Sequence, residues 1–183
     1  MRKDCPQNLE QAVQAGDLLP DSHKNITRLL DSPETAARDK ESVLELVEQG
    51  QWGELNDRFF RTLAFGTGGL RGRTVGKVVT EAERGTPTAL GRPEFPAVGT
   101  NCMNYGNVAR ATKGLVNYLK KNFAGQAPSV VFSHDTRHFS REFVELSAQI
   151  VAGMGGTAYL FAEDRSTPEL SFAVRHFGAQ AGV

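Results

Sequence analysis

The sequence predicts an α/β fold with three layers, in which helices cover both faces of a mixed, mostly parallel sheet, with extra helices at the N-terminus. In the second half, short apolar runs alternate with segments of helical periodicity, an order typical of parallel sheets covered by helices. The first part of the chain contains only helical patterns, and a glycine-rich stretch at residues 65–72 separates the two parts. We therefore expect a sheet-containing domain preceded by a helical layer.

The N-terminal segment is predicted to form short helices that pack together and carry no site. Between residues 31 and 50, Asp31 or Ser32 is expected as the N-cap, and Glu34 stands where a capping box after Asp31 requires an acid. Gly50 is expected to end this helix. Its apolar stripe consists of Val43, Leu44, Leu46 and Val47. A second short helix is expected to bury Leu55, Phe59 and Leu63.

The segment after the glycine-rich stretch is predicted to begin as a strand and to continue as a long loop. Residues 74–80 contain several β-branched side chains, which favour strands. Residues 81–101 contain three prolines and three glycines, which favour irregular structure. Loops of this length are commonly functional or disordered.

The second half shows the alternation that predicts the fold class. Apolar residues at helical spacing predict a helix over about residues 102–122, and the apolar run at 128–134 predicts a buried strand. A helix is then expected to begin with Ser140 as its N-cap, and residues 157–161 are expected to form the next strand. The inner face of that helix is expected to consist of Phe143, Leu146, Ile150, Val151 and Met154.

The last helix and the end of the chain continue the pattern. Ser166 and Glu169 form a predicted capping box around Pro168. The inward face of this helix is expected to consist of Leu170, Ala173, Val174 and Phe177. The chain stops at Val183, where the alternation predicts a further strand, so we expect a piece of a longer protein whose exposed sheet edge favours self-association.

The composition fits an ordinary globular domain and excludes several classes of partner. The 183 residues suit one α/β domain, and 21 basic residues balance 21 acidic ones, so no positive field would attract nucleic acid or an anionic membrane. The first 20 residues have no apolar core of signal-peptide length, and no stretch approaches the length of a membrane span, so we expect neither feature. Cys5 and Cys102 have no metal-ligand spacing and no pairing pattern, so we expect two thiols in a reducing compartment, the cytoplasm.

The stretch FGTGGLRG, residues 65–72, is the first candidate site. Its four glycines suit a tight turn with positive φ, or a backbone that approaches an anion, and the composition leaves these two interpretations open. It matches neither a P-loop nor a dinucleotide fingerprint. Arg71 could bind a phosphate through two parallel hydrogen bonds, or it could be an ordinary surface or salt-bridged arginine.

The stretch SHDTRHFS, residues 133–140, is the second candidate site. It follows a predicted strand and precedes a predicted helix, and this carboxyl end is where open α/β sheets bind ligands. Taken alone, Asp135 more simply holds the turn through an Asx-type hydrogen bond. His134 and His138 are not favoured as metal ligands, because no third ligand has matching spacing.

Four segments are specific when their order is considered: FGTGGLRG, GTNCMNYGNVARATKGLVNYL, SHDTRHFSREF and STPELSFAVRHFGAQAGV. In this order they resemble the first domain of the α-D-phosphohexomutase superfamily, and most closely its phosphoglucomutase and phosphopentomutase branch. The resemblance covers about residues 55–183, which are therefore expected to form this first domain, domain I. Residues 1–54 are therefore expected to form an N-terminal helical extension.

The resemblance implies an isomerase of carbohydrate metabolism that interconverts sugar 1-phosphates and sugar 6-phosphates. Family members have four domains, and a phosphoserine on the first exchanges its phosphoryl group with the phosphosugar substrate through a sugar 1,6-bisphosphate. Mg²⁺ bridges the serine phosphate and an aspartate triplet on the second domain. The sequence ends before that serine, so the catalytic serine, the metal ligands and the C-terminal domains are expected outside this chain.

By the same resemblance, Arg71 matches the arginine of the loop near the phosphoserine, and Arg137 matches the arginine of a D-x-R segment beside it. Thr67, Gly68 and Gly69 match positions of the phosphate-binding loop. The chain alone is predicted to have no mutase activity. Phosphopentomutase or phosphomannomutase activity is the alternative within the superfamily, and a non-catalytic anion-binding or interaction module of the same fold is the alternative of another class.

Overall fold

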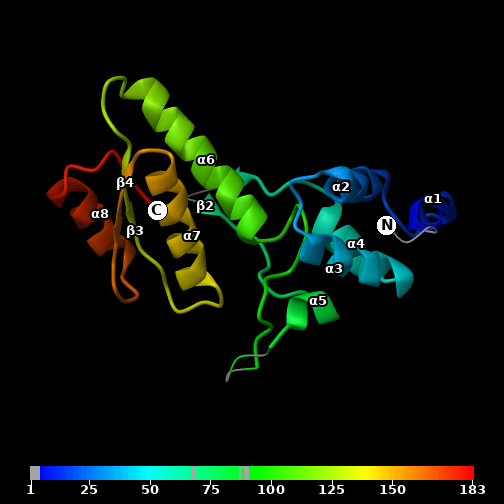
Figure 1. The fold of residues 1–183 in the computed structure, drawn as a ribbon. Helices are drawn as coiled ribbons and strands as arrows, with labels where there is room; N and C mark the ends of the chain where they lie inside the picture. Colours follow the sequence, from blue (N-terminus) through cyan, green and yellow to red (C-terminus); the bar gives the residue numbers. More distant parts are fainter. Residues whose placement is uncertain (1–4, 67–68, 87, 89–90) are drawn as a thin grey trace. The chain divides into compact units, whose positions relative to one another are not determined.

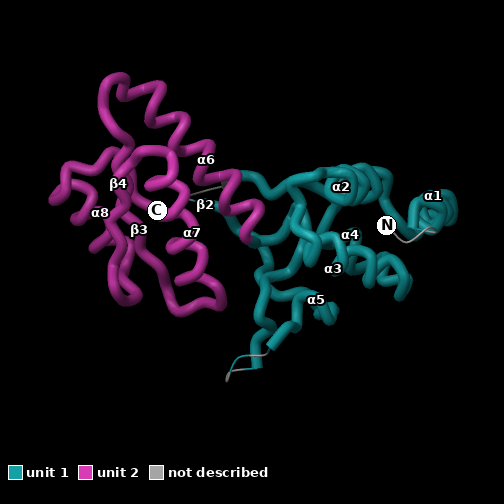
Figure 2. Tube along the Cα trace, in the orientation of Figure 1, with its two compact units in different colours: residues 1–104 teal, residues 105–183 magenta. Residues whose placement is uncertain are grey.

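The helices and strands of the chain fall into two units in the computed structural model (Figures 1 and 2). The structure describes residues 5–66, 69–86, 88 and 91–183. Unit 1 comprises residues 1–104, unit 2 comprises residues 105–183, and each has its own core. The expected division between residues 54 and 55 concerns the relation to the family and stays a prediction.

Unit 1 begins with a layer of packed helices and continues as largely irregular chain. Its helices are α1 (Cys5–Ala15), α2 (Pro20–Asp31), α3 (Ala37–Glu48), α4 (Trp52–Phe59) and α5 (Glu81–Arg84). Its strands are β1 (Phe65–Gly66) and β2 (Gly69–Leu70), which pair in antiparallel fashion. The predicted burial is confirmed for Leu55, Phe59 and Leu63. The helices α1 to α4 thus form the predicted packing layer, because each buries an apolar stripe in one shared core.

The helix α3 has the predicted stripe but not the predicted start. All four residues of the stripe are buried, and Gly50, with a φ of +62°, follows the end of the helix, so both predictions are confirmed. The expected N-cap is wrong, because Asp31 is the last residue of α2 and α3 begins only at Ala37. The Ser32 hydroxyl accepts the Glu34 N–H at 3.3 Å, so it closes the turn between two helices instead of capping one.

Residues 74–80 do not form a strand, and this prediction is wrong. Two of their backbone polar groups bond to side chains of α4 rather than to a neighbouring strand. The Val78 carbonyl accepts from Arg58 Nη2 at 2.6 Å. The Lys77 N–H donates to Glu54 Oε1 at 3.1 Å. The β-branched residues of this segment do not decide its structure, because the side chains of Arg58 and Glu54 already form hydrogen bonds with its backbone.

The predicted loop at 81–101 starts with the single turn of α5. This turn is closed by a capping box, in which the Glu83 N–H donates to Thr80 Oγ1 at 3.2 Å and the Thr80 N–H donates to Glu83 Oε2 at 3.4 Å. The other described residues of this segment contain no further helix or strand.

Unit 2 is a three-stranded parallel sheet between two layers of helices (Figure 1). The strand order is β4-β3-β5, so β3 is central. Helices α6 and α7 pack on one face, and α8 packs on the other. The predicted α/β fold, with helices on both faces of a parallel sheet, is confirmed. The elements are α6 (Tyr105–Asn122), β3 (Ser129–Phe132), α7 (Ser140–Gly153), β4 (Thr157–Leu160), α8 (Thr167–His176) and β5 (Ala181–Gly182).

Side chains of the central strand β3 alternate between the two helical layers. Val130 and Phe132 belong to the core that the strand forms with α6 and α7. Val131, which points the other way, is also buried and pairs in register with Gly182 of β5. A Cβ on Gly182 would lie 2.6 Å from a methyl carbon of Val174, so α8 packs directly on this strand. The central strand is thus covered on both faces, as strands of parallel sheets usually are.

The contact between α6 and α7 includes a polar pair that the apolar periodicity does not predict. The buried hydroxyl oxygens of Thr112 and Ser147 lie 3.0 Å apart. Ser147 Oγ also lies 2.8 Å from the Phe143 carbonyl of its own helix. Of the five residues expected on the inner face of α7, Phe143 and Val151 are buried. The buried face of α7 therefore runs through Ser147 rather than through apolar residues alone.

Two further expectations for the helices of unit 2 are wrong. Phe139, with a φ of +67°, is the N-cap of α7, and Ser140 is already the first helical residue. Phe177 is not buried on the inner face: it is the C-cap of α8 and is 48% exposed, although one side of its ring stacks on Tyr159 of the edge strand β4 with the centroids 4.6 Å apart. The acid half of the predicted capping box of α8 is present, since Glu169 Oε2 accepts the N–H of the N-cap serine at 3.3 Å.

Candidate functional site

The carboxyl ends of the three parallel strands lie at one edge of the sheet of unit 2. From β3 the chain passes through α7 to β4 on one side, and from β4 it passes through α8 to β5 on the other side of β3. Open α/β sheets bind ligands at such a reversal, beyond the carboxyl ends of the strands. The segments after β3 and β5 meet there, because the Ser133 N–H donates to the Val183 carbonyl at 2.9 Å. Residues 133–139 and Val183 thus border the candidate site.

The loop after β3 presents Asp135 and Arg137 on a tight turn. Asp135 Oδ1 accepts the Arg137 N–H at 3.2 Å, which is the Asx-type turn that the sequence favours. Asp135 Oδ2 accepts from Arg137 Nε at 2.7 Å. The Arg137 side chain is 83% exposed, and its terminal nitrogens carry the other donors of the guanidinium. The carboxylate thus orients an exposed arginine at the edge of the sheet, where it can bind an anion.

The surroundings of Asp135 lower the pKa of its carboxyl group. Burial alone would raise this pKa, but the Arg137 N–H, the Ser140 hydroxyl and the Arg137 guanidinium together outweigh it. The Ser140 Oγ also accepts the Asp135 N–H at 3.1 Å, so the first residue of α7 braces the turn. Asp135 is therefore ionised at neutral pH and can hold the arginine by charge as well as by hydrogen bonds.

The loops after β3 and β4 are bonded to each other at the same edge. The Arg165 N–H donates to the His134 carbonyl at 3.1 Å, and the Ser133 hydroxyl donates to the Arg165 carbonyl at 3.3 Å. Arg141 Nη1 donates to the Ala162 carbonyl. The first two bonds fix the candidate loop to the segment after β4, and the third joins that segment to α7.

Phe139 turns the chain from the candidate loop into α7 with a left-handed backbone conformation, φ +67° and ψ 2°. For a residue with a side chain this conformation costs about 1–2 kcal/mol. The ring is 1% exposed and lies near Phe143, with the centroids 6.1 Å apart, and Phe143 meets Tyr105 edge to face at 5.7 Å. Burial of the ring stabilises the strained turn, and strain of this kind is concentrated at functional sites.

The glycine-rich stretch forms a hairpin in unit 1, because β1 pairs with β2. Thr67 and Gly68 of the predicted phosphate-binding loop lie outside the described residues. Gly69 has a φ of +153°, with open space at the place of a Cβ. Arg71 follows β2 directly and is exposed. Arg71 belongs to unit 1 and Arg137 to unit 2, so their common role at one phosphate stays a prediction.

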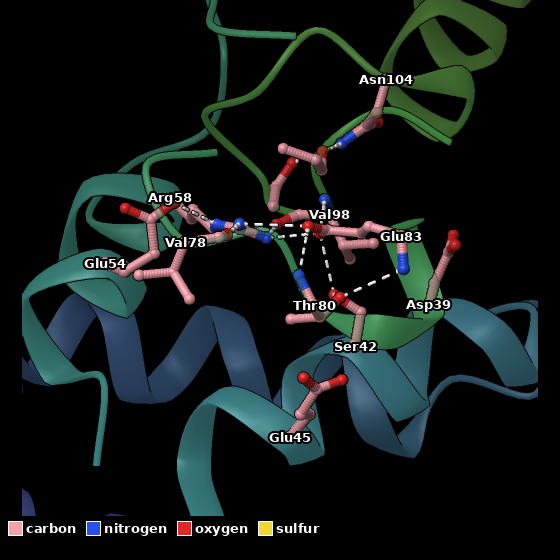
Figure 3. A network of polar contacts seen from close by, with 12 residues as sticks. Asp39, Ser42, Glu45, Glu54, Arg58, Val78, Thr80, Glu83, Val98 and Asn104 are labelled. Carbon is pink, nitrogen blue, oxygen red and sulfur yellow. Dashed lines mark hydrogen bonds and ion pairs between the residues drawn. The ribbon is translucent and has the colours of Figure 1, made fainter. Parts of the chain in front are cut away.

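Sequence reasoning missed a buried polar network in unit 1 (Figure 3). At its centre is Arg58, whose Nε donates to Glu54 Oε1 at 2.7 Å and whose Nη1 donates to Glu83 Oε1 at 2.5 Å. Glu83 Oε1 also accepts from Ser42 Oγ at 2.8 Å and from the Val98 N–H at 2.9 Å. The network joins α3, α4 and α5 to the chain around residue 98. Its only signal in the sequence is the i, i+4 spacing of the glutamate and arginine on α4.

The Arg58 guanidinium keeps its charge although it is buried. Burial lowers its pKa, but the hydrogen bonds and charges of Glu83 and Glu54 outweigh burial, so the pKa lies above the usual value. Cys102 lies close to this network and is 3% exposed, and burial raises the pKa of its thiol to about 11. A Cβ on Gly99 would lie 3.1 Å from the Cys102 sulfur, so the chain is tightly packed around the thiol.

Two further properties of the described residues bear on function. None of their helices is both long and apolar enough to cross a bilayer. Among the same residues, no group of three His, Cys, Asp or Glu side chains could hold a metal ion.

Residues 96–183 match the family model described as phosphoglucomutase/phosphomannomutase, alpha/beta/alpha domain I. The match covers all of unit 2, including the candidate loop after β3. It does not cover the glycine-rich hairpin or the helices α1 to α5. No solved structure matches the chain.

Several curated relatives are phosphoglucomutases of staphylococci. That of Staphylococcus epidermidis is 35% identical over 122 residues, which are 67% of this chain and 18% of the relative. That of Staphylococcus haemolyticus is 31% identical over 144 residues, 78% of this chain and 22% of the relative. That of Staphylococcus aureus is 31% identical over 141 residues, 77% of this chain and 21% of the relative. The chain thus spans about a fifth of the length of these relatives.

Proposed function

Residues 96–183 belong to the phosphoglucomutase/phosphomannomutase domain I family, and on this premise we propose that the chain is part of a phosphoglucomutase-type enzyme. This enzyme interconverts a sugar 1-phosphate and a sugar 6-phosphate in carbohydrate metabolism. Its substrate is a phosphosugar, and its intermediate is a sugar 1,6-bisphosphate. The relatives named phosphoglucomutase support the assignment.

The observation that carries the proposal is the position of the Asp135–Arg137 turn inside the matched range. The turn follows the central strand of a parallel sheet, at the edge where the direction of the crossovers reverses. A guanidinium held through its Nε by a carboxylate presents its remaining donors to one side, which suits a phosphate. In this role Arg137 binds and neutralises a phosphoryl group, and Arg71 of the hairpin is the second phosphate contact.

Phosphoryl transfer needs placement and charge neutralisation more than covalent help from other side chains. The described residues include two arginines, Arg71 in unit 1 and Arg137 in unit 2, each of which can bind and neutralise a phosphate. Mg²⁺ serves such enzymes by neutralising charge on the transferred group. The described residues do not fit this ion, since they offer no cluster of three suitable ligands, so we assign no metal ligand to this chain.

The chain alone is inactive in this proposal, because its candidate serines have other tasks. Ser140 Oγ accepts the Asp135 N–H, and the Ser166 hydroxyl lies 3.2 Å from Glu169 Oε2. Both hydroxyls stand at helix N-termini, where one braces the turn before α7 and the other belongs to the cap of α8. By the family resemblance, we propose that the phosphoserine of the parent enzyme belongs to a segment outside these 183 residues.

The first test is an isomerisation assay on the purified chain. Glucose 1-phosphate, with Mg²⁺ and glucose 1,6-bisphosphate added, should give no glucose 6-phosphate above the background without protein. Turnover above background would contradict the proposed inactivity. Pentose and mannose phosphates, tested in the same way, extend this result to the alternative substrates.

The second test asks whether the two arginines bind phosphate. Inorganic phosphate is titrated into the ¹⁵N-labelled chain, and arginine Nε–H signals are followed by NMR. Arg137→Ala and Arg71→Ala should each weaken binding, whereas Arg175→Ala and Arg28→Ala, at exposed arginines of the same two units, should not. If all four variants bind phosphate like the parent chain, the assignment of both sites is wrong. Phosphate binding by a full-length protein that shows no turnover would favour the non-catalytic module.

A further inference from the structure

The two residues that follow Arg71, Gly72 and Arg73, attach the chain to the rest of unit 1. Gly72 lies against residues 101–103, because a Cβ here would stand 2.9 Å from the Met103 nitrogen and 3.1 Å from the Asn101 oxygen. No side chain fits at this crossing without a shift of backbone. The Met103 N–H then donates to the Arg73 carbonyl at 3.0 Å. Arg71 is thus the last residue of the hairpin segment before the point of attachment.

The Arg73 side chain adds a second attachment, to the helix α4. Its Nη2 donates to Asp57 Oδ2 at 3.0 Å, and its Nη1 lies 3.5 Å from Glu54 Oε2. The Arg73 side chain is 35% exposed and that of Asp57 is 43% exposed, so the pair is only partly open to solvent. A partly shielded ion pair is screened less than a pair on the open surface. Two carboxylates, one helical turn apart on α4, therefore hold the residue that lies two positions after Arg71.

Asp57 also binds the chain four residues after Arg73, at Lys77. Its Oδ2 accepts from Lys77 Nζ at 2.8 Å. The hydrogen bond from Lys77 is the main cause that lowers the pKa of Asp57; burial opposes it, and Arg73 adds to the lowering. Between the two cations, the Thr74 carbonyl accepts the Ala97 N–H at 2.8 Å. A single carboxylate thus binds both ends of residues 73–77, and one backbone bond secures the middle.

The geometry points to Asp57 as a positioning residue: through Arg73 and Lys77 it anchors the segment that carries Arg71, and so places that guanidinium for a phosphate. This inference rests on the proposed role of Arg71 in phosphate binding. Asp57 itself touches no substrate. It acts through the backbone, since its partner Arg73 is separated from Arg71 only by the tightly packed Gly72.

A purely structural role for Asp57 predicts a different result. If the carboxylate only stabilised α4 or the helical core, its removal would loosen the whole of unit 1. A positioning role predicts local loosening, confined to the bonds that attach residues 73–77. Two amide protons report this attachment directly, those of Met103 and Ala97, because they donate to the carbonyls of Arg73 and Thr74. The Phe60 amide, which donates to Asn56 at the end of α4, reports the helix.

The test compares Asp57→Asn with the unaltered 183-residue chain by amide hydrogen exchange and phosphate titration. We expect the Met103 and Ala97 amides to exchange about fivefold faster in the variant, while the Phe60 amide is unchanged. Asp57→Glu, which restores the charge, should return exchange toward that of the parent chain. Asp21→Asn, an exposed acid on α2, is the control and should change none of the three amides.

In the titration, Asp57→Asn should weaken inorganic phosphate binding at the Arg71 Nε–H signal by about fivefold. Equal acceleration of all three amides, or none, would overturn the inference. Faster exchange at Met103 and Ala97 with no phosphate binding to either protein would leave Asp57 as an anchor and contradict the proposed function of Arg71. Faster exchange with unchanged phosphate affinity would overturn the positioning of Arg71 while its phosphate site stands.

Discussion

Arg58 and Glu83 form an ion pair in which both side chains are almost completely buried, 1% and 2% exposed. They come from α4 and α5, and Glu83 is further bonded to α3 and to the Val98 N–H. Without Glu83, Arg58 would keep Glu54 as its one carboxylate partner, and the hydrogen bonds that Ser42 and the Val98 N–H donate to Glu83 would be weakened or lost. The pair therefore links the helical layer of unit 1 to the irregular chain that follows the hairpin.

Glu83→Gln should destabilise unit 1 by about 1.5–3 kcal/mol, because Arg58 would keep only Glu54 as a carboxylate partner and lose its charge-assisted hydrogen bonds to Glu83. Urea unfolding followed by fluorescence measures this, since Trp52, the one tryptophan of the chain, packs against the core of unit 1. Glu81→Gln is the matched control in the same helix, where the side chain is 75% exposed, and should cost less than about 1 kcal/mol. Equal midpoints for the two variants would contradict the role of the buried pair.

Gly76→Ala and Gly53→Ala should shift the stability of unit 1 in opposite directions. A Cβ on Gly76 would stand 2.0 Å from Arg58 Nη2 and 2.7 Å from Glu54 Oε1, so the substitution displaces the network and costs about 1–3 kcal/mol. Gly53 lies in α4 with no atom within 4 Å of its Cβ position, so alanine should add up to about 1 kcal/mol through helix propensity. The same urea experiment measures both, and a stabilising Gly76→Ala would disprove the close packing.

Phe139→Gly should leave unit 2 more stable than Phe139→Ala by about 1 kcal/mol, because glycine adopts a positive φ without strain and alanine does not. Both variants lose the buried ring and should be less stable than the parent chain by about 3–5 kcal/mol. Thermal unfolding followed by circular dichroism gives the order of the three proteins. The reverse order of glycine and alanine would show that the left-handed turn is not strained.

Asp135 should titrate below the usual range of aspartate, and Arg137→Ala should move its pKa upward. Because the folded pKa is lowered, the stabilisation from Asp135 is complete above the pKa of the unfolded chain and is lost as pH falls through the folded value. Carboxyl ¹³C shifts followed from neutral to acid pH measure the midpoint, and Asp135→Asn identifies the signal. An unchanged midpoint in Arg137→Ala would mean that the guanidinium does not hold the carboxylate in solution.

The helices and strands of unit 2 could be predicted from sequence because several local signals agree there. Residues 128–134 and 157–161 are short apolar runs, and each is followed by a helix with its own apolar stripe. The boundaries shift by a few residues, as in α6, which begins at Tyr105 rather than near residue 102. The candidate loop after β3 could be located for the same reason, since the end of a parallel strand fixes its place.

The features that the sequence did not predict depend on contacts between residues far apart in the chain, or on an unusual backbone conformation. The segment 74–80 has strand propensity, but its conformation is set by Arg58, which lies 20 positions before Val78. The network itself joins Arg58 and Glu83, which lie 25 positions apart, and no local sequence pattern predicts such a pair. Phe139 adopts a conformation that mainly glycine, asparagine and aspartate favour, so its residue type gives no warning of the turn. Sequence patterns report local preference, and these features depend on tertiary contacts.

The buried thiol of Cys102 can report on transient local opening of unit 1. Alkylating reagents attack only the thiolate, and with a pKa of about 11 that form is about one part in a thousand at pH 8. The sulfur is also buried, since Cys102 is 3% exposed and lies against the backbone of Gly99. Labelling at Cys102, as distinct from Cys5, therefore requires a transient opening of the chain around Arg58, and its rate reports that opening in the otherwise folded protein.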